Sequence, residues 1–257
     1  MNKRHEARIL PRLFNTTARR MMGTITHVST QDTVAALTFD DGPHPESTPR
    51  LLDILEKHQA HVTFFMVGEA AQQYPEIVRR AAQSGHAIGN HGWDHPSFPL
   101  ISGRERRAQL RACAKATAPH GQQLFRPPYG HQSIASRLDA LWLGYEVVTW
   151  NVAAVDWLDH DAEWMTNRLI SIIKPGSVIL FHDVLYHTIE ARYADREPML
   201  EAVDMLLEEL GDSFHFITVP ELLRHGRPQR RNWYWKADPD WLNTLQGEQS
   251  EARRYAC

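Results

Sequence analysis

The sequence predicts an α/β fold, a single-domain barrel of about seven parallel strands. Short apolar segments typical of buried strands alternate with amphipathic helical segments along most of the chain, and this alternation indicates a parallel sheet. The number of strands favours a barrel over an open doubly wound sheet, which is the alternative. A chain of 257 residues with 42% hydrophobic residues is long enough to form one large core.

The first half of the chain alternates strand and helix at short intervals. The run 34–39 is apolar and leads into a turn with Gly-Pro, and Leu51 and Leu55 lie on the apolar side of the helix that follows. Pro75 opens the next helix and Gly85 closes it. In chain order we expect strand 34–39, helix 48–58, strand 61–67, helix 75–84, strand 87–90, helix 104–118 and strand 124–126.

The second half continues the same alternation. The segment 145–152 is rich in β-branched and aromatic residues, which favours a strand, and Pro175-Gly176 ends the helix before the next strand. In chain order we expect helix 133–143, strand 145–152, helix 162–174, strand 177–181, helix 199–210 and strand 214–219. The organisation is therefore an N-terminal extension (1–32), a barrel domain (33–225) and a C-terminal extension (226–257), whose aromatic and basic run 230–236 we expect to pack on the barrel.

Composition excludes several classes of protein. A formal net charge of −3 and a pI near 6.6 give no electrostatic footprint for nucleic acid. Two cysteines, Cys113 and Cys257, imply no disulfide framework. We expect a cytoplasmic protein without an integral membrane segment, because Met1 to Gly23 lack the apolar stretch of a secretory signal and no apolar run is long enough to cross a bilayer.

Polar side chains gather at one edge of the predicted sheet. They stand at or just past the carboxyl ends of predicted strands, where parallel barrels assemble their active sites. These residues are Asp40, Asp41, His91, Arg126, Asn151 and His182. This coincidence predicts a reactive site, because charges at buried strand ends persist when they are paired or bind a metal.

The two aspartates and two histidines predict a catalytic metal site. His91 and His95 form a His-x-x-x-His pair, which on one helical turn would direct both imidazoles at one ion. In a chain with 15 histidines roughly one such pair arises by chance, so the nearby aspartates carry the prediction. We expect Asp41, His91 and His95 to bind the metal and Asp40 to act as the general base. These ligands suit Zn²⁺, with Co²⁺, Ni²⁺ or iron as alternatives.

Five motifs of this chain resemble, in order, those of the NodB-like polysaccharide deacetylases (carbohydrate esterase family four). They are Thr38-Phe39-Asp40-Asp41-Gly42-Pro43, His91-Gly92-Trp93-Asp94-His95, Arg126-Pro127-Pro128-Tyr129-Gly130, Asp156-Trp157 and Leu180-Phe181-His182-Asp183. The resemblance covers roughly residues 34–223. It implies a distorted (β/α) barrel over the domain 33–225, which removes acetyl groups from N-acetylated sugars with a divalent ion, usually zinc.

The resemblance also implies roles for residues outside the metal set. Arg126 would pair with Asp40 and orient its carboxylate, as a bidentate guanidinium can. The Tyr129 backbone N–H would help to stabilise the oxyanion. His182 would be the general acid, kept charged and aligned by Asp156. Leu180 would line the pocket for the acetyl methyl group.

Two tryptophans are candidates for substrate contact. Trp93 and Trp157 offer apolar faces to a sugar ring, although packing alone would also explain an aromatic residue at either position.

The chain departs from the family pattern at two positions. Gly92 stands where the family usually has Ser or Thr, so a hydroxyl that would hold the loop is missing and a looser loop is expected. Ala153 replaces the first carboxylate of the motif that contains Asp156, which puts the usual substrate preference in question.

The predicted function is deacetylation of an N-acetylated sugar or oligosaccharide. One alternative is a metal-dependent amidohydrolase that acts on a small non-sugar C–N bond, and another is a non-catalytic carbohydrate-binding barrel. A phosphohydrolase of the haloacid dehalogenase type needs Asp-x-Asp, which the adjacent Asp40 and Asp41 do not provide.

Overall fold

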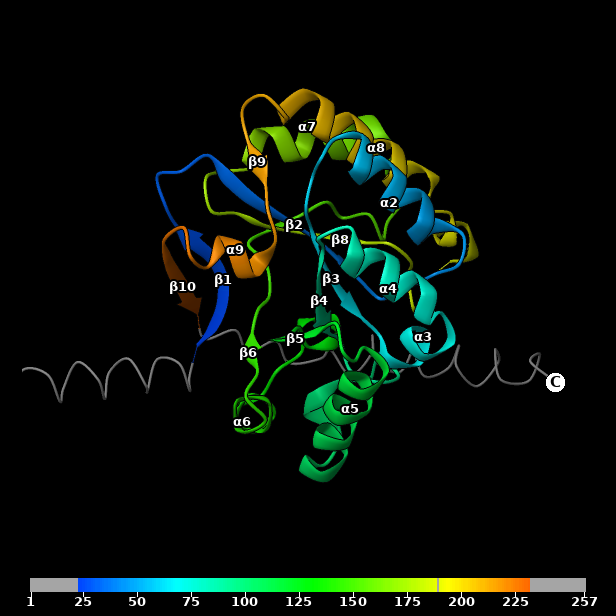
Figure 1. Cartoon of the computed structure of the whole chain (residues 1–257), viewed down its shortest axis with the longest axis vertical. Helices are drawn as coiled ribbons and strands as arrows, with labels where there is room; N and C mark the ends of the chain where they lie inside the picture. Colours follow the sequence, from blue (N-terminus) through cyan, green and yellow to red (C-terminus); the bar gives the residue numbers. More distant parts are fainter. Residues whose placement is uncertain (1–22, 189, 232–257) are drawn as a thin grey trace, which may run out of the picture.

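A curled parallel sheet forms the centre of the computed structural model, which describes residues 23–188 and 190–231. Seven parallel strands of the described chain follow the order β6-β5-β4-β3-β2-β8-β7, and a short β9 pairs with β2 beside this path (Figure 1). Their bounds are β2 (Val34–Asp40), β3 (Thr63–Met66), β4 (Ala87–Asn90), β5 (Gly121–Phe125), β6 (Glu146–Val147), β7 (Val152–Ala153), β8 (Val178–His182) and β9 (His215–Phe216). The predicted distorted (β/α) barrel is confirmed.

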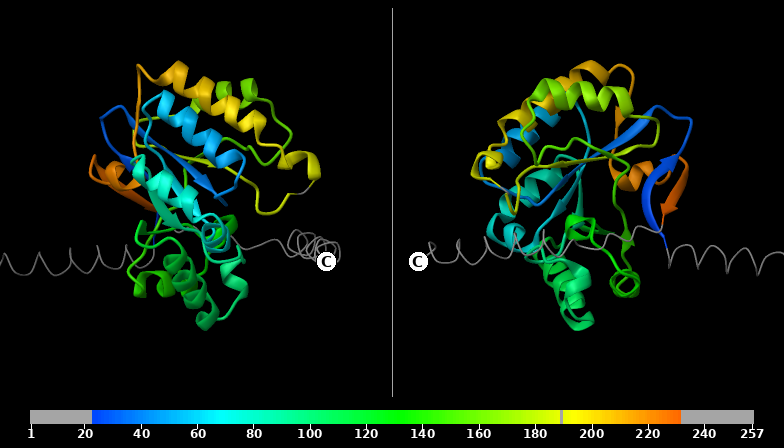
Figure 2. Two further views of the ribbon diagram at one scale, coloured as in Figure 1. Left: turned by 45° about the vertical axis from the view of Figure 1, so that its right-hand side comes forward. Right: turned by 180° about the vertical axis from the view of Figure 1, so that it is seen from behind.

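Helices cover the outside of the sheet. In the described residues they are α2 (Ser47–Lys57), α3 (Gly68–Gln73), α4 (Pro75–Gln83), α5 (Gly103–Ala116), α6 (Ile134–Trp142), α7 (Ala162–Ile172), α8 (Glu197–Leu210) and α9 (Val219–Leu222), with short 3₁₀ turns at Phe98–Leu100, Pro128–Gly130 and Ala191–Ala194. Helices α2, α7 and α8 lie together on one side, whereas α5 and α6 lie at the opposite end (Figure 2). No helix in these ranges is long and apolar enough to cross a membrane.

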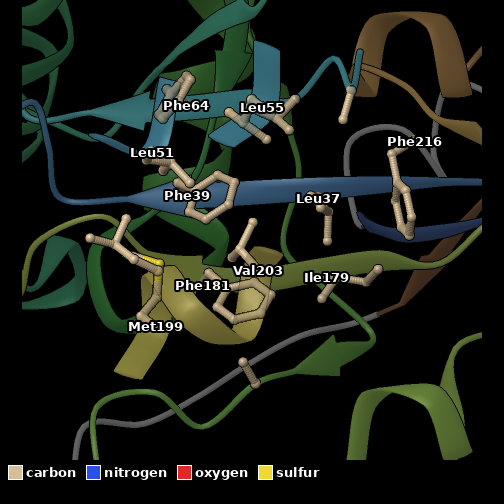
Figure 3. Close-up of a cluster of buried hydrophobic side chains, with 14 of the residues drawn as sticks. Leu37, Phe39, Leu51, Leu55, Phe64, Ile179, Phe181, Met199, Val203 and Phe216 are labelled. Atoms are coloured by element: carbon tan, nitrogen blue, oxygen red, sulfur yellow. The ribbon is translucent and has the colours of Figure 1, made fainter. Parts of the chain in front are cut away.

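Strand β2 separates the hydrophobic core from the barrel interior. Leu37 and Phe39 point outward, where Phe39 lies 5.6 Å from the ring centroids of both Phe64 and Phe181 (Figure 3). Because successive side chains of a strand point to opposite faces, the next residue, Asp40, faces the interior. Packing of the outer face therefore fixes where this carboxylate is placed.

Two further strands lie in the segments that the sequence assigns to the extensions. Strand β1 (Thr24–Ser29) pairs antiparallel with β10 (Arg227–Arg231), and Ile25 bridges to Val148 beside β6. The folded body thus includes residues on both sides of 33–225. Residues 232–236 of the aromatic and basic run lie outside the described residues.

The predicted strand 145–152 is broken in two. It forms β6 and β7, which sit at opposite edges of the sheet path. Asn151 lies between them, and its side-chain oxygen accepts the backbone N–H of Val178 at 2.8 Å. Val178 begins β8 whereas His182 ends it, so Asn151 stabilises the far end of the barrel and does not join the other polar residues.

Candidate active site

Backbone conformation brings two adjacent aspartates to one site. Asp40 ends β2, and Asp41 follows with a left-handed φ of 79°. In a regular strand the two side chains would diverge, but the left-handed residue breaks the alternation. As a result both carboxylates face His91, whose Nε2 lies 3.8 Å from Asp40 Oδ2 and 3.3 Å from Asp41 Oδ1.

Gly42 and Asp183 hold this turn. The Gly42 N–H donates to Asp183 Oδ1 at 3.0 Å, and Thr48 Oγ1 donates to Asp183 Oδ2 at 2.5 Å. A Cβ at Gly42 would come within 2.0 Å of Asp183 Oδ2, so only glycine fits. Burial raises the pKa of Asp183 to about 7, an effect that Asp41 reinforces.

Asp41, His91 and His95 converge on a single point. One ligand atom from each lies within 4.8 Å of the other two, and all three residues are buried. Burial alone would raise the pKa of Asp41, but the His95 and His91 imidazoles hold it well below its usual range. The Asp41 Oδ2 accepts the Tyr186 backbone N–H at 2.9 Å, whereas Oδ1, 3.1 Å from His95 Nε2, is buried without a hydrogen-bond donor.

The contact of His91 Nδ1 with a backbone carbonyl favours the tautomer that a divalent cation in this set would need. His91 Nδ1 lies 2.8 Å from the Arg126 carbonyl oxygen, which can only accept, so Nδ1 carries the proton. In the neutral imidazole Nε2 then presents a lone pair to the Asp41 Oδ1 lone pairs. Two atoms that present lone pairs to each other repel, and a cation bound between them turns this repulsion into attraction to the cation. The predicted ligand set is therefore compatible with a metal.

A loop, not a helical turn, brings the two histidines together. Residues 91–97 are irregular, and Gly92 (φ 87°) and His95 (φ 57°) both adopt left-handed backbone. The expectation that the pair lies on one helical turn is wrong, because these two residues turn the chain back toward Asp41. Two side-chain oxygens hold the backbone of this loop: Asn90 Oδ1 accepts the Gly92 N–H at 2.9 Å and Gln109 Oε1 accepts the Trp93 N–H at 2.6 Å.

Asp40 and Arg126 form a buried ion pair. Arg126 is 0% exposed, and its Nη1 donates to Asp40 Oδ1 and to Thr38 Oγ1, both at 2.7 Å. Its remaining nitrogens donate to the carbonyl oxygens of Val148 and Thr149. The contact uses one nitrogen, so it is not the bidentate pair that the resemblance suggests, and Asp40 Oδ2 is left directed toward His91.

His182 and Asp156 form a second pair on the opposite side of Asp40. The register of β2 and β8 places Asp40 beside His182. His182 Nδ1 lies 3.0 Å from Asp156 Oδ1, and the His182 backbone N–H donates to Asp156 Oδ2 at 2.8 Å. Burial disfavours the imidazolium, but Asp156, with smaller effects of Asp41 and Asp40, raises the pKa of His182 to about 9.

Arg196 is a site residue that the sequence interpretation missed. Its Nη2 donates to Asp156 Oδ2 at 2.7 Å. Arg196 immediately precedes α8 and does not follow a predicted strand. Neither hydrophobic periodicity nor a position at the carboxyl end of a strand therefore identifies it.

The remaining predicted residues surround this centre. Leu180 is 2% exposed and lies on the same face of β8 as His182, since Ile179 and Phe181 belong to the outer core. The Tyr129 backbone is left-handed (φ 58°), and its ring centroid lies 4.3 Å from that of His95. The Trp157 ring lies 5.5 Å from His182.

Trp93 belongs to the histidine loop and is partly buried. A Cβ at Gly68 would come within 2.8 Å of the Trp93 ring, so this tryptophan packs against the start of α3. This contact is one of packing, so the part of the Trp93 ring that faces α3 needs no role in substrate binding to explain it.

Comparison with known proteins finds relatives that are named as deacetylases. A family model described as polysaccharide deacetylase matches residues 27–148. A peptidoglycan-N-acetylglucosamine deacetylase of Bacillus cereus is 34% identical over 200 residues, which cover 76% of this chain and 70% of the relative. A chitooligosaccharide deacetylase of Azorhizobium caulinodans is 35% identical over 171 residues, 63% of this chain and 80% of the relative.

Solved structures share the fold. The Bc1960 peptidoglycan N-acetylglucosamine deacetylase matches with a TM-score of 0.73 and 30% identity, over 84% of this chain and 99% of that chain. A Bacillus anthracis protein described as a pseudoenzyme has the same fold, with a TM-score of 0.71 and 23% identity over 81% of this chain and 72% of that chain. The fold alone therefore does not show activity. Together with the matching residues and the 34% identical relative, these similarities show that the chain belongs to the NodB-like polysaccharide deacetylase family.

Proposed function

We propose that this protein is a metal-dependent hydrolase that removes N-acetyl groups from an N-acetylated sugar or oligosaccharide. The observation that carries the proposal is the position of Asp40, which lies beside the buried metal-ligand set, is paired with Arg126 and neighbours His182. Relatives named as deacetylases of peptidoglycan N-acetylglucosamine and of chitooligosaccharides support a sugar substrate.

The chain's own residues would hold the cofactor and move the protons. Asp41, His91 and His95 would bind the divalent cation, for which we propose zinc. When bound, such a cation supplies Lewis acidity, which makes the acetyl carbonyl more electrophilic and water more acidic. Asp40 takes a proton from the attacking water, whose oxygen forms a bond to the acetyl carbonyl carbon.

His182 completes the reaction on the leaving group. Because Nδ1 is bound to Asp156, the Nε2 proton is the one that passes to the sugar nitrogen as the C–N bond breaks. The products are acetate and a free amine. We propose that the Tyr129 backbone N–H donates to the oxyanion, that Leu180 contacts the acetyl methyl group, and that Trp93 and Trp157 contact the sugar.

An acetate-release screen tests this function. The protein is loaded in turn with Zn²⁺, Co²⁺, Ni²⁺ and Fe²⁺ and assayed with chitooligosaccharides, peptidoglycan fragments and a small cyclic amide. We expect acetate from at least one sugar, with the highest rate for the zinc form. Hydrolysis of the cyclic amide alone would favour an amidohydrolase, and saccharide binding without turnover would favour a binding protein. A cytoplasmic location stays a prediction, which cell fractionation tests.

The pH dependence of the reaction is expected to report His182. Its imidazolium stays protonated below about pH 9, so kcat/KM for acetate release should fall as the pH rises through that value. Burial lowers the pKa of His182 and the Asp156 carboxylate raises it, and Asp156→Asn removes this carboxylate. The descending limb should therefore move to or below about pH 6.5, the ordinary pKa of histidine. A pH–rate profile of both proteins checks this, and an unmoved limb would contradict the assignment of His182 as the acid.

A further inference from the structure

We propose that Arg196 is a positioning residue that keeps Asp156 ionised and correctly oriented while His182 gives up its proton. The inference rests on the proposed function, because it assumes that His182 is the general acid. Arg196 acts through Asp156 and would touch neither the substrate nor the metal.

The guanidinium of Arg196 contacts both the side chain and the backbone of Asp156. Besides the 2.7 Å bond from Nη2 to Oδ2, both Nη1 and Nη2 lie 3.1 Å from the Asp156 carbonyl oxygen. Asp156 Oδ1 is left for the His182 Nδ1. Asp156 Oδ2 also accepts the His182 backbone N–H, so donors hold both carboxylate oxygens and the carbonyl oxygen. These contacts restrict the orientation of Asp156, and the Asp156 contact to Nδ1 leaves His182 Nε2 directed away from Asp156.

The charges of this group change during the reaction, and Arg196 compensates for that change. The Asp156 side chain is 0% exposed and that of Arg196 is 5% exposed. Before proton transfer, Asp156 is balanced by two cations, the His182 imidazolium and Arg196. After transfer, Arg196 is its remaining cationic partner among the described residues. An unpaired buried carboxylate is unfavourable, so without Arg196 the proton would be harder for His182 to release.

Three carboxylates, those of Asp156, Asp41 and Asp40, favour the His182 imidazolium. The His95 imidazole also interacts with His182, and a positive charge on either ring disfavours one on the other. Burial raises the pKa of Asp156, whereas His182 and Arg196 lower it, so Arg196 competes with His182 for the same carboxylate. Loss of Arg196 should therefore raise the pKa of His182, in contrast to loss of Asp156, which should lower it.

The test compares Arg196→Gln and Arg196→Lys with Asp156→Asn, with the double variant Asp156→Asn/Arg196→Gln and with Arg192→Gln. Arg192 is a matched control because it is an exposed arginine four positions earlier that pairs with Asp159 and Glu190. We expect Arg196→Gln to lower kcat for acetate release by about 10- to 100-fold, with unchanged KM and metal content. Lysine should restore part of this loss, and the control should behave as the native protein.

The double variant distinguishes positioning from a structural role. If Arg196 acts through Asp156, Asp156→Asn/Arg196→Gln should lose no more activity than Asp156→Asn alone. Losses that multiply in the double variant would overturn the proposal, as would a native kcat in Arg196→Gln.

A readout without turnover separates this inference from the proposed function. An NMR titration of the His182 imidazole should show a higher pKa in Arg196→Gln and a lower one in Asp156→Asn than in the native protein. Opposite shifts in a protein that releases no acetate would show that Arg196 acts on His182 through Asp156 and would refute the proposed function, and with it the role of Arg196 in deacetylation. An unchanged or lowered pKa in Arg196→Gln of an active deacetylase would refute the positioning role alone.

Discussion

Asp40→Asn is expected to lower kcat/KM for acetate release by about 10²- to 10⁴-fold while the protein still binds its metal. The asparagine keeps the shape of the side chain, and its amide oxygen can still accept from Arg126 Nη1, which lies 2.7 Å from Oδ1 in the native protein. It cannot take a proton from water. Because Asp40 is not among the three convergent ligands, the metal site should survive.

This substitution also has a cost in stability that the experiment must separate from catalysis. Arg126 is fully buried, and loss of the Asp40 charge leaves it without its anionic partner, an effect of about 3 kcal/mol for a broken buried pair. We therefore expect a lower Tm, and activity should be measured well below it. Near-native turnover by the folded, metal-loaded Asp40→Asn variant would refute its role as the base.

Asp41→Asn is expected to give the opposite pattern, with metal affinity reduced by at least about 100-fold and activity lost for that reason. Asp41 supplies the one anionic ligand of the set, and its Oδ1 lies 3.3 Å from His91 Nε2 and 3.1 Å from His95 Nε2. A neutral amide oxygen attracts a divalent cation far less than a carboxylate does.

The neighbouring residue provides the control for this second prediction. Asp40→Asn and Asp41→Asn change the same atoms one position apart, so their metal contents after dialysis should differ sharply. Isothermal titration with Zn²⁺ measures both affinities. A native affinity in Asp41→Asn would remove this residue from the ligand set, and chelation of the native protein should abolish activity until metal is restored.

Contacts between distant residues account for what the sequence alone did not reveal. Arg196 is 40 positions from Asp156, and Asp183 is 141 positions from Gly42, and no local pattern indicates that either pair meets. The left-handed conformation of Asp41 was equally hidden, because a strand period predicts that adjacent carboxylates diverge. Asn151 was misplaced since one predicted strand became two on opposite edges of the sheet.

The sequence by itself determined the family, the parallel α/β architecture and the residues that converge at the strand ends, since these depend on local periodicity and on short motifs. Only the tertiary structure decided how these side chains are oriented. The order of the strands sets His182 beside Asp40, and backbone turns direct Asp41 and His95 at one point. Burial then gives each charge a specific partner, because a buried charge is stable only where the fold provides one.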